Sequence, residues 1–316
     1  MKPGIKKLLS IFAVFVFLNC FASVSYAQKV AVGGGPLGGT YYILATGFAK
    51  ILNEDVGLDA SVEVGGGGVQ NIKLIEADQT HFGITMASLY DTGVKGTGWA
   101  KGKKYENVTI MFPMQLSYLH FWTLKKTGLR SVNDLNGHIV NVSKKGSGAD
   151  VAGRKIIEMF NLKPKRIINL GHTAANQAMQ DNLAHAALTA GSIPHPAVAA
   201  ISTTHDVVQF GLVGNQATEY LKVKPSYVRT AIPANTYRGQ TDPVTTVGDY
   251  NIMICNKNAP EDLVYKVVKA TYENIPKWAS VHRAAASMNP EGIKGLMKYS
   301  IHPGALRYFR EIGILQ

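Results

Sequence analysis

The chain has almost no cysteine: Cys20 and Cys255 are the only two among 316 residues. Cys20 lies in an N-terminal apolar stretch whose removal would leave a single thiol, so no internal disulfide could form. Cys255 ends the apolar run Ile252–Cys255. We therefore expect it to be a small buried core residue and not a reactive thiol.

Motifs for metal, phosphate and covalent chemistry are also absent. The nine histidines show neither H-E-x-x-H nor H-x-x-x-H spacing, which argues against a zinc site. The sequence contains no G-x-x-x-x-G-K-[ST] phosphate loop and no G-x-S-x-G nucleophile elbow. We find no pair of carboxylates with the spacing of an acid and a base. The sequence therefore indicates no catalytic residue, no metal ligand and no cofactor.

Only one apolar run is long, and it lies at the N-terminus. Three lysines within residues 2–7 precede the apolar stretch Leu8–Phe21. The following Ser25-Tyr26-Ala27 has small residues at the two positions that a signal peptidase recognises. This order is typical of a secretory signal, with an apolar core too short to span a membrane. We predict cleavage after Ala27 and a periplasmic mature protein.

A second interpretation of this segment is a lipoprotein signal cut at Cys20. Asn19 before that cysteine fits the lipoprotein pattern poorly, so this interpretation ranks second.

Acidic residues are in the minority, and the formal net charge is +12. Loss of the three leader lysines leaves an excess of nine positive charges. A basic surface can attract nucleic acid, anionic membranes or anionic solutes. The lysines are dispersed and no nucleic-acid-binding module is present, so we expect no nucleic-acid partner. A general solubility surface is favoured, and attraction of anionic solutes ranks second.

Three glycine-rich turns are the plainest positive feature. Each follows a strand-like run and precedes a helix-like run. A helix that starts at such a turn has backbone N–H groups without intrahelical partners, and these groups attract a carboxylate or phosphate. Three such turns suggest one cleft that holds a small anion. The turns are Gly33–Gly39, Gly65–Gly68 and Gly146–Gly148.

The first turn also satisfies G-x-G-x-x-G over residues 33–38, which is a dinucleotide-binding pattern. Glu63, on the next predicted strand, could serve as the ribose-binding acid. However, Val64 and four glycines follow Glu63 and form a second anion-type turn, and an exported chain is a poor host for a nicotinamide cofactor. The dinucleotide interpretation stays a minor alternative.

Strands alternating with helices predict an α/β fold. We expect a signal peptide (1–27), a first lobe (28–116), a second lobe (117–231) and a return to the first lobe with C-terminal helices (232–316). The hinge would lie near Pro113–His120 and Val228–Pro233, and a ligand would bind between the lobes, beyond the carboxyl ends of the strands. The expected strands are 30–32, 61–64, 81–86, 108–112, 121–124, 138–142, 166–170, 186–189 and 252–255. The expected helices are 40–53, 69–77, 88–93, 149–160, 174–183 and 262–278.

Seven segments together carry a resemblance to a known family: Gly38–Tyr42, Gly68–Ile75, Ser131–Gly137, Gly146–Gly148, Ile232–Gln240, Leu263–Tyr265 and His302–Glu311. They resemble the TAXI-type solute receptors of TRAP (tripartite ATP-independent periplasmic) transporters, and the resemblance covers nearly all of the mature chain. Two departures lie near the presumed cleft: Asn182 and His185 stand where the family usually has glycine and aspartate, and the polar residue common after the third strand is replaced around Met86–Ser88.

The resemblance implies a two-lobed periplasmic binding protein of type II, each lobe a mixed sheet flanked by helices. It implies capture of a small organic anion, such as the amino acid glutamate or the dicarboxylate 2-oxoglutarate, and delivery to a TRAP permease driven by an ion gradient. It implies a monomer without a cofactor or enzymatic activity. Two alternatives stay open: a periplasmic sensor that signals to a membrane kinase and, ranked lower, an enzyme on the same fold.

We expect ten residues to form the site. Backbone donors around Gly39, Thr40 and Gly68, together with the Asn71 amide, would hold one end of the anion, and the second lobe would contribute Ser147, Gly148 and Ala149. Tyr41 and Ser88 would shape the rest, and Pro194 would wall the far side. Competing interpretations are a helix cap for Asn71 and Ser147, a solvated helix face for Arg154 and a loop position for His195.

Overall fold

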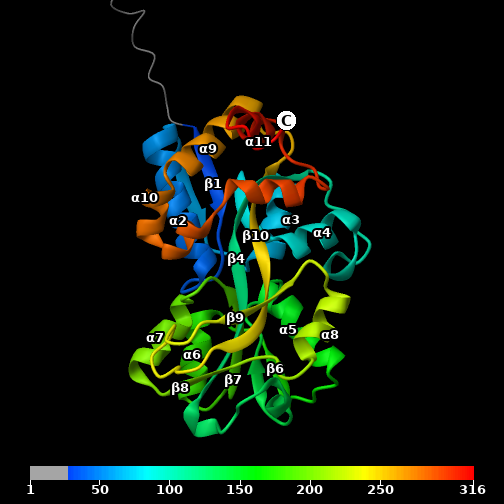
Figure 1. Ribbon diagram of the computed structural model, residues 1–316, viewed down its shortest axis with the longest axis vertical. Helices are drawn as coiled ribbons and strands as arrows, with labels where there is room; N and C mark the ends of the chain where they lie inside the picture. Colours follow the sequence, from blue (N-terminus) through cyan, green and yellow to red (C-terminus); the bar gives the residue numbers. More distant parts are fainter. Residues whose placement is uncertain (1–27) are drawn as a thin grey trace, which may run out of the picture.

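The computed structural model describes residues 28–316, which form two lobes stacked along the long axis (Figure 1). The predicted leader and its cleavage after Ala27 lie outside the described residues. All ten strands belong to one sheet, in which β2-β1-β3-β10-β4-β7-β5-β6 are neighbours, while β8 pairs with β4 and β9 with β10.

The first lobe is built from β–α units. Its strands β1, β2 and β3 are parallel and are followed by helices that all start at the same edge of the sheet. The predicted alternation is confirmed here. The elements are β1 (Lys29–Gly33), α2 (Thr40–Ile51), β2 (Asp59–Glu63), α3 (Gly68–Glu76), β3 (Phe82–Met86) and α4 (Ala87–Lys95).

The second lobe repeats this arrangement, with β5 parallel to β6 and to β7. Beyond β7 the chain forms two helices and two strands that the sequence does not predict. The elements are β5 (Ile139–Asn141), α5 (Gly148–Met159), β6 (Arg166–Ile168), α6 (His172–Gln180), β7 (Ala186–Gly191), α7 (Pro196–Thr204), β8 (Val207–Phe210), α8 (Gln216–Val223) and β9 (Val228–Ile232).

Two long antiparallel strands, β4 (Val108–Leu124) and β10 (Val244–Asn256), run through both lobes (Figure 1). The prediction of two strands interrupted at residues 114–120 is wrong, because β4 is continuous. Pro113 lacks an N–H and suggests a break, but the pairing register of β10 shifts between Tyr250 and Ile252, directly opposite this proline.

The return crossing between the lobes lies later in the chain than the sequence predicts. Residues 228–232 form β9, which pairs only with Val244–Gly248 at the start of β10. The connection back to the first lobe is the remainder of β10, which reaches β3 through Asn251–Cys255. The lobe boundaries at residues 117 and 232 stay predictions.

The C-terminal segment packs on the first lobe (Figure 1). The predicted helix 262–278 is divided in two, because Pro276 has no N–H to donate and its ring prevents a continuous helix. Trp278 follows this break, donates from its indole to Leu44 O at 2.9 Å and stacks on Phe48. The elements are α9 (Glu261–Glu273), α10 (Ile275–Val281) and α11 (Pro303–Glu311).

Short turns of other helix types complete the chain. They are a π-helical turn (Leu52–Val56) and 3-10 turns at Gly98–Ala100, Lys125–Thr127, Val132–Leu135, Arg283–Ser287 and Pro290–Leu296.

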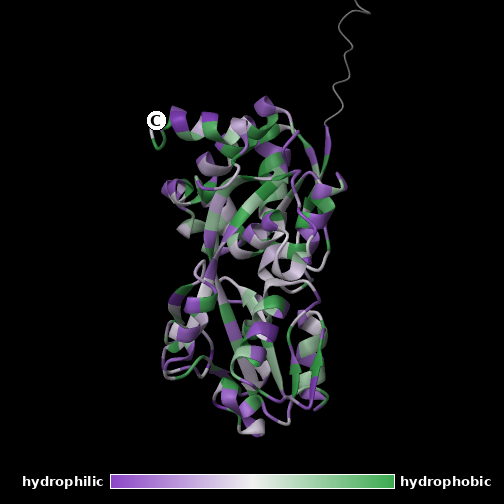
Figure 2. Ribbon diagram, turned by 90° about the vertical axis from the view of Figure 1, so that its right-hand side faces the viewer, coloured by the Kyte–Doolittle hydropathy of each residue, from purple (hydrophilic) through white to green (hydrophobic). Residues whose placement is uncertain are grey.

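Apolar residues are frequent in the central strands, whereas the helices contain both polar and apolar residues (Figure 2). Cys255 is fully buried on β10, as predicted, and burial raises the pKa of its thiol. Among residues 28–316, no helix has the length and apolar character needed to cross a bilayer.

The contact between α2 and Trp278 gives a test of the packing. A Cβ on Gly47 would lie 2.5 Å from Trp278 Cδ1 in the core of the first lobe. Gly47→Ala should therefore lower the free energy of unfolding by about 1–3 kcal/mol, since an overpacked core strains its neighbours. Urea unfolding measures this value. Gly295→Ala, where a Cβ meets no atom within 4 Å, is the control; equal losses in both variants would contradict the packing described here.

Candidate functional site

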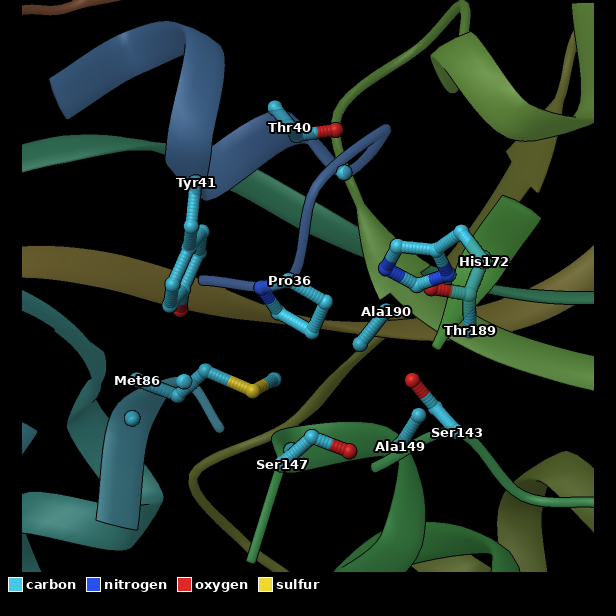
Figure 3. Close-up of a pocket in the computed structure, with 14 residues that line it drawn as sticks. Pro36, Thr40, Tyr41, Met86, Ser143, Ser147, Ala149, His172, Thr189 and Ala190 are labelled. Atoms are coloured by element: carbon cyan, nitrogen blue, oxygen red, sulfur yellow. The ribbon is translucent and has the colours of Figure 1, made fainter. Parts of the chain in front are cut away.

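A cavity of about 380 Å³, which includes space open to solvent, lies where the two lobes meet (Figure 3). Residues from both lobes line it, and none of them carries a charged carboxylate, ammonium or guanidinium group. The lining residues are Pro36, Gly39, Thr40, Tyr41, Gly67, Gly68 and Met86 from the first lobe, and Ser143, Ser147, Gly148, Ala149, His172, Thr189 and Ala190 from the second.

The first turn brings the start of α2 to this cavity. Gly39 is the N-cap, and no side chain caps the helix. The first N–H groups of α2 therefore have no intrahelical partner. The Thr40 hydroxyl is buried and has no hydrogen-bond partner in the described structure. A Cβ on Gly39 would lie 2.7 Å from the imidazole of His172, so glycine permits the close approach of the lobes here.

The second and third glycine turns meet each other across the cleft. Val69 N–H, in the first turn of α3, donates to Gly146 O in the second lobe at 3.2 Å. A Cβ on Gly148, at the start of α5, would lie 2.2 Å from Met86 Sδ in the first lobe. These contacts show that the lobes are closed against each other, with the N-termini of α3 and α5 at the shared cavity.

A fourth helix, α6, also starts at the cavity; the sequence analysis predicts this helix but not its place at the site. His172 is the first residue of α6, is 5% exposed and lines the cavity beside Thr189 and Ala190 (Figure 3). Its Nδ1 has no hydrogen-bond partner in the described chain. Burial, with a smaller contribution from Lys144, lowers the pKa of His172 to about 4, so the ring is neutral at pH 7. The sequence does contain the signal for this helix start: Gly171 follows the predicted strand 166–170, just as the three glycine-rich turns follow predicted strands.

Seven of the ten expected residues line this cavity. They are Gly39, Thr40, Tyr41, Gly68, Ser147, Gly148 and Ala149. Asn71, Ser88 and Pro194 are not among the lining residues.

Asn71 holds the first lobe together. Its buried Nδ2 donates to the carbonyl oxygens of Gly33, Gly34 and Ile84 at 3.0, 2.9 and 2.8 Å. Gly33 and Gly34 lie at and just after the end of β1, and Ile84 lies in the middle of β3, so the amide connects the two strands that carry the site. The structure therefore gives Asn71 neither the ligand contact nor the helix cap considered from the sequence.

Ser88 and Pro194 lie away from the lining. Ser88 N–H, in the first turn of α4, donates to Asp249 Oδ2 at 3.0 Å. Pro194 is half-buried and precedes His195, the N-cap of α7. The structure thus places Ser88 in a buried polar cluster and Pro194 beside a histidine cluster.

One capping interpretation and one surface interpretation are confirmed. Ser147 Oγ accepts from Asp150 N at 3.1 Å and caps α5, which leaves the first N–H groups of that helix facing the cavity. Arg154, with a half-exposed side chain, pairs with Asp150 at 2.7 Å on the outside of the helix and does not line the cavity.

His195 lies in the loop between β7 and α7, as expected from the sequence, but it is fully buried. Its Nε2 lies 3.3 Å from the hydroxyl of Thr189, and its ring centroid lies 4.9 Å from that of His172 and 5.5 Å from that of His120. Burial lowers the pKa of all three rings, so this cluster is neutral at pH 7. Among the described residues, no group of three or more histidine, cysteine or acidic side chains could hold a metal ion.

A buried acid lies behind Tyr41, and the sequence analysis missed this residue too. Tyr41 OH donates to Asn251 Oδ1 at 2.6 Å, and Asp249 lies two residues earlier on β10. Asp249 is fully buried, and burial raises the pKa of its carboxyl to about 7, partly offset by hydrogen bonds from Ser88. Polar residues at 249 and 251 within an otherwise apolar strand were the available signal.

The three bonds of Asn71 predict a stability effect. Asn71→Ala should lower the free energy of unfolding by about 2 kcal/mol, because the two N–H groups of the amide, shared among three buried carbonyls, are lost at about 1 kcal/mol each. Urea unfolding of both proteins measures this loss. Asn258→Ala, at an exposed position, is the control. A variant as stable as the parent would contradict the structural role.

The pKa of Asp249 predicts a pH dependence. Because the folded pKa of about 7 lies above the ordinary value of 3.8, ionisation destabilises the fold as pH rises between these values, by about 1.4 kcal/mol per pH unit. Asp249→Asn removes this ionisation. The melting temperature of the variant minus that of the parent should therefore be larger at pH 8 than at pH 4. A difference independent of pH would contradict the buried, unpaired carboxyl.

The fold matches those of solved proteins over nearly the whole chain. A structure of Rpa4515 from R. palustris, solved with adipate, aligns with a TM-score of 0.60 and 14% identity and covers 91% of this chain and 97% of that one. The periplasmic binding protein BugD aligns with a TM-score of 0.58 and 14% identity, covering 91% and 98%. A periplasmic transporter protein aligns with a TM-score of 0.57 and 12% identity, covering 93% and 99%. The predicted type II periplasmic binding protein fold is therefore confirmed.

The sequence also assigns the chain to a protein family. Residues 32–313, which extend from the end of β1 through α11, match one family of proteins. The chain belongs to the NMT1-like family.

Proposed function

We propose that this chain is an extracytoplasmic solute-binding protein that captures a small organic anion by closure of its two lobes and delivers it to a membrane permease. The observation that carries the proposal is the meeting of four helix N-termini, those of α2, α3, α5 and α6, at one cavity to which both lobes contribute. Backbone N–H groups and helix dipoles at such ends favour a negative charge.

The strength of binding follows from this geometry. A hydrogen bond to a charged oxygen contributes about 1.5–3 kcal/mol in a closed, dry site, and micromolar affinity needs about 8 kcal/mol net. Donors from four helix ends supply enough bonds even after the cost of ordering the ligand and both lobes. No acid and base side chains line the cavity together, which supports binding over turnover.

The finer features of the proposal rest on the sequence resemblance. We assign the chain to the TAXI-type receptors, with a TRAP permease as its partner, the periplasm as its location and a monomeric state. The ligand would be an amino acid such as glutamate or a dicarboxylate such as 2-oxoglutarate. The lobes would comprise residues 28–116 with 232–316, and residues 117–231.

A screen tests the proposal directly. Mass spectrometry of small molecules that copurify with residues 28–316, followed by thermal-shift assays with amino acids, monocarboxylates and dicarboxylates, should identify acids that raise the melting temperature. A panel in which no acid binds would contradict the proposal.

Closure gives a second test. Gly148→Val should weaken binding of the best acid by about tenfold or more, because its Cβ would collide with Met86 Sδ when the lobes close and the displacement of this flexible side chain costs about 1–3 kcal/mol. The three nearest atoms to this Cβ all belong to Met86 in the other lobe, so the unliganded variant should unfold at the same urea concentration as the parent. Isothermal titration and urea unfolding measure the two values. Unchanged affinity would contradict capture by closure.

A further inference from the structure

Unpartnered polar atoms gather behind Tyr41. Asp249 Oδ1, Asn251 Nδ2 and Ser117 Oγ have no hydrogen-bond partner in the described structure, and all three residues are at most 1% exposed. Asp249 and Ser117 face each other in the register of β10 and β4. We call Ser88, Ser117, Asp249 and Asn251 the Asp249 cluster. Buried polar groups almost always have partners, so this concentration requires an explanation.

The Asp249 cluster lies next to the cavity. Tyr41 lines the cavity with its ring and donates from its hydroxyl to Asn251 Oδ1 at 2.6 Å. Met86 also lines the cavity and is the register partner of Asn251 on β3. Two side chains, one of them a flexible methionine, therefore separate the helix N-termini from the Asp249 cluster.

Asp249 has no cationic partner nearby. None of the ion pairs within 4.0 Å among residues 28–316 includes it. The groups that act on it are Tyr41 from α2, Ser88 from α4, Tyr220 from α8, Tyr227 before β9 and Tyr299 after the turn Pro290–Leu296, and Lys224 acts on it only through its field. Ser88 N–H donates to Asp249 Oδ2, so Oδ1 is the oxygen of this buried carboxyl that lacks a donor in the described structure.

The unpartnered atoms match one kind of ligand. Asp249 Oδ1 and Ser117 Oγ can accept hydrogen bonds from a primary ammonium, and Asn251 Nδ2 can donate to a carboxylate oxygen. A second carboxylate would instead meet Asp249 as a like charge. The cluster thus distinguishes an amine from an acid at this end of the site.

We propose that the Asp249 cluster is an amine subsite, so that the ligand is an amino acid whose carboxylate lies at the helix N-termini and whose ammonium binds Asp249. This inference rests on the proposed function and narrows its ligand class. Tyr41 releases Asn251 when the ammonium enters. The amine is the counter-charge that no described side chain supplies in contact with this carboxyl.

Isothermal titration with matched ligand pairs tests the subsite. L-glutamate carries an ammonium where 2-oxoglutarate has a ketone, and 5-aminopentanoate carries one where pentanoate has a hydrogen. Residues 28–316 should bind the amine member of at least one pair tenfold or more tightly than its partner. Asp249→Asn should remove this preference by weakening the amine member at least tenfold while leaving the other within about twofold. Asp242→Asn, an exposed acid just before β10, should keep it.

The outcomes separate the two proposals. Two outcomes overturn the amine subsite and leave the proposed function standing. In the first, acids bind without any preference for the amine member of a pair. In the second, the preference survives in Asp249→Asn. Absence of binding by every acid of the panel overturns both. The preference of the parent protein is informative by itself, so the test does not depend on the folding of a variant.

Discussion

The site depends on the close approach of backbone to side chain across the cleft. At Gly39 a Cβ would lie 2.7 Å from the His172 imidazole, and at Gly148 a Cβ would lie 2.2 Å from Met86 Sδ. Glycine at these helix starts therefore does two things at once. It lets the lobes meet, and it leaves the first N–H groups of the helices uncovered at the cavity that the contact encloses. Closure and anion recognition follow from the same residues.

A site built from dipoles behaves differently from one built from charged side chains. No lining residue carries a net charge, and burial keeps the nearby histidines neutral. A lysine or arginine would attract an anion in the open form as well. Helix ends that belong to different lobes act together on one ligand only when the lobes are closed, so an anion favours the closed form through its differential affinity. The dispersed basic surface would contribute mainly to the rate of encounter.

Local chemistry made much of the fold predictable. Each β–turn–α unit carries its own glycine signal, so the expected starts of α2, α3 and α5 fall within one residue of those observed. Long-range features were not predictable in this way. From the sequence, Pro113 indicates the end of a strand. In the structure the strand continues, because a register shift in the distant β10 accommodates the proline. For the same reason the return crossing, which depends on the pairing of β10 with β4 and β3, could not be read from residues 228–233.

The dependence on contacts that are distant in the sequence also explains which polar residues were assigned correctly. Backbone donors at Gly39 and Gly148 follow from their place in a turn, whereas the role of a buried side chain depends on partners far away in the sequence. Asn71 and Asn251 illustrate the difference: the Nδ2 of the first has three carbonyl partners, and that of the second has none. An amide nitrogen with carbonyl partners, as in Asn71, stabilises the lobe, because its removal leaves buried carbonyls without a donor. An unsatisfied amide beside an unpaired carboxyl costs stability in the absence of a partner, and a ligand that supplies both an ammonium and a carboxylate would recover that cost on binding.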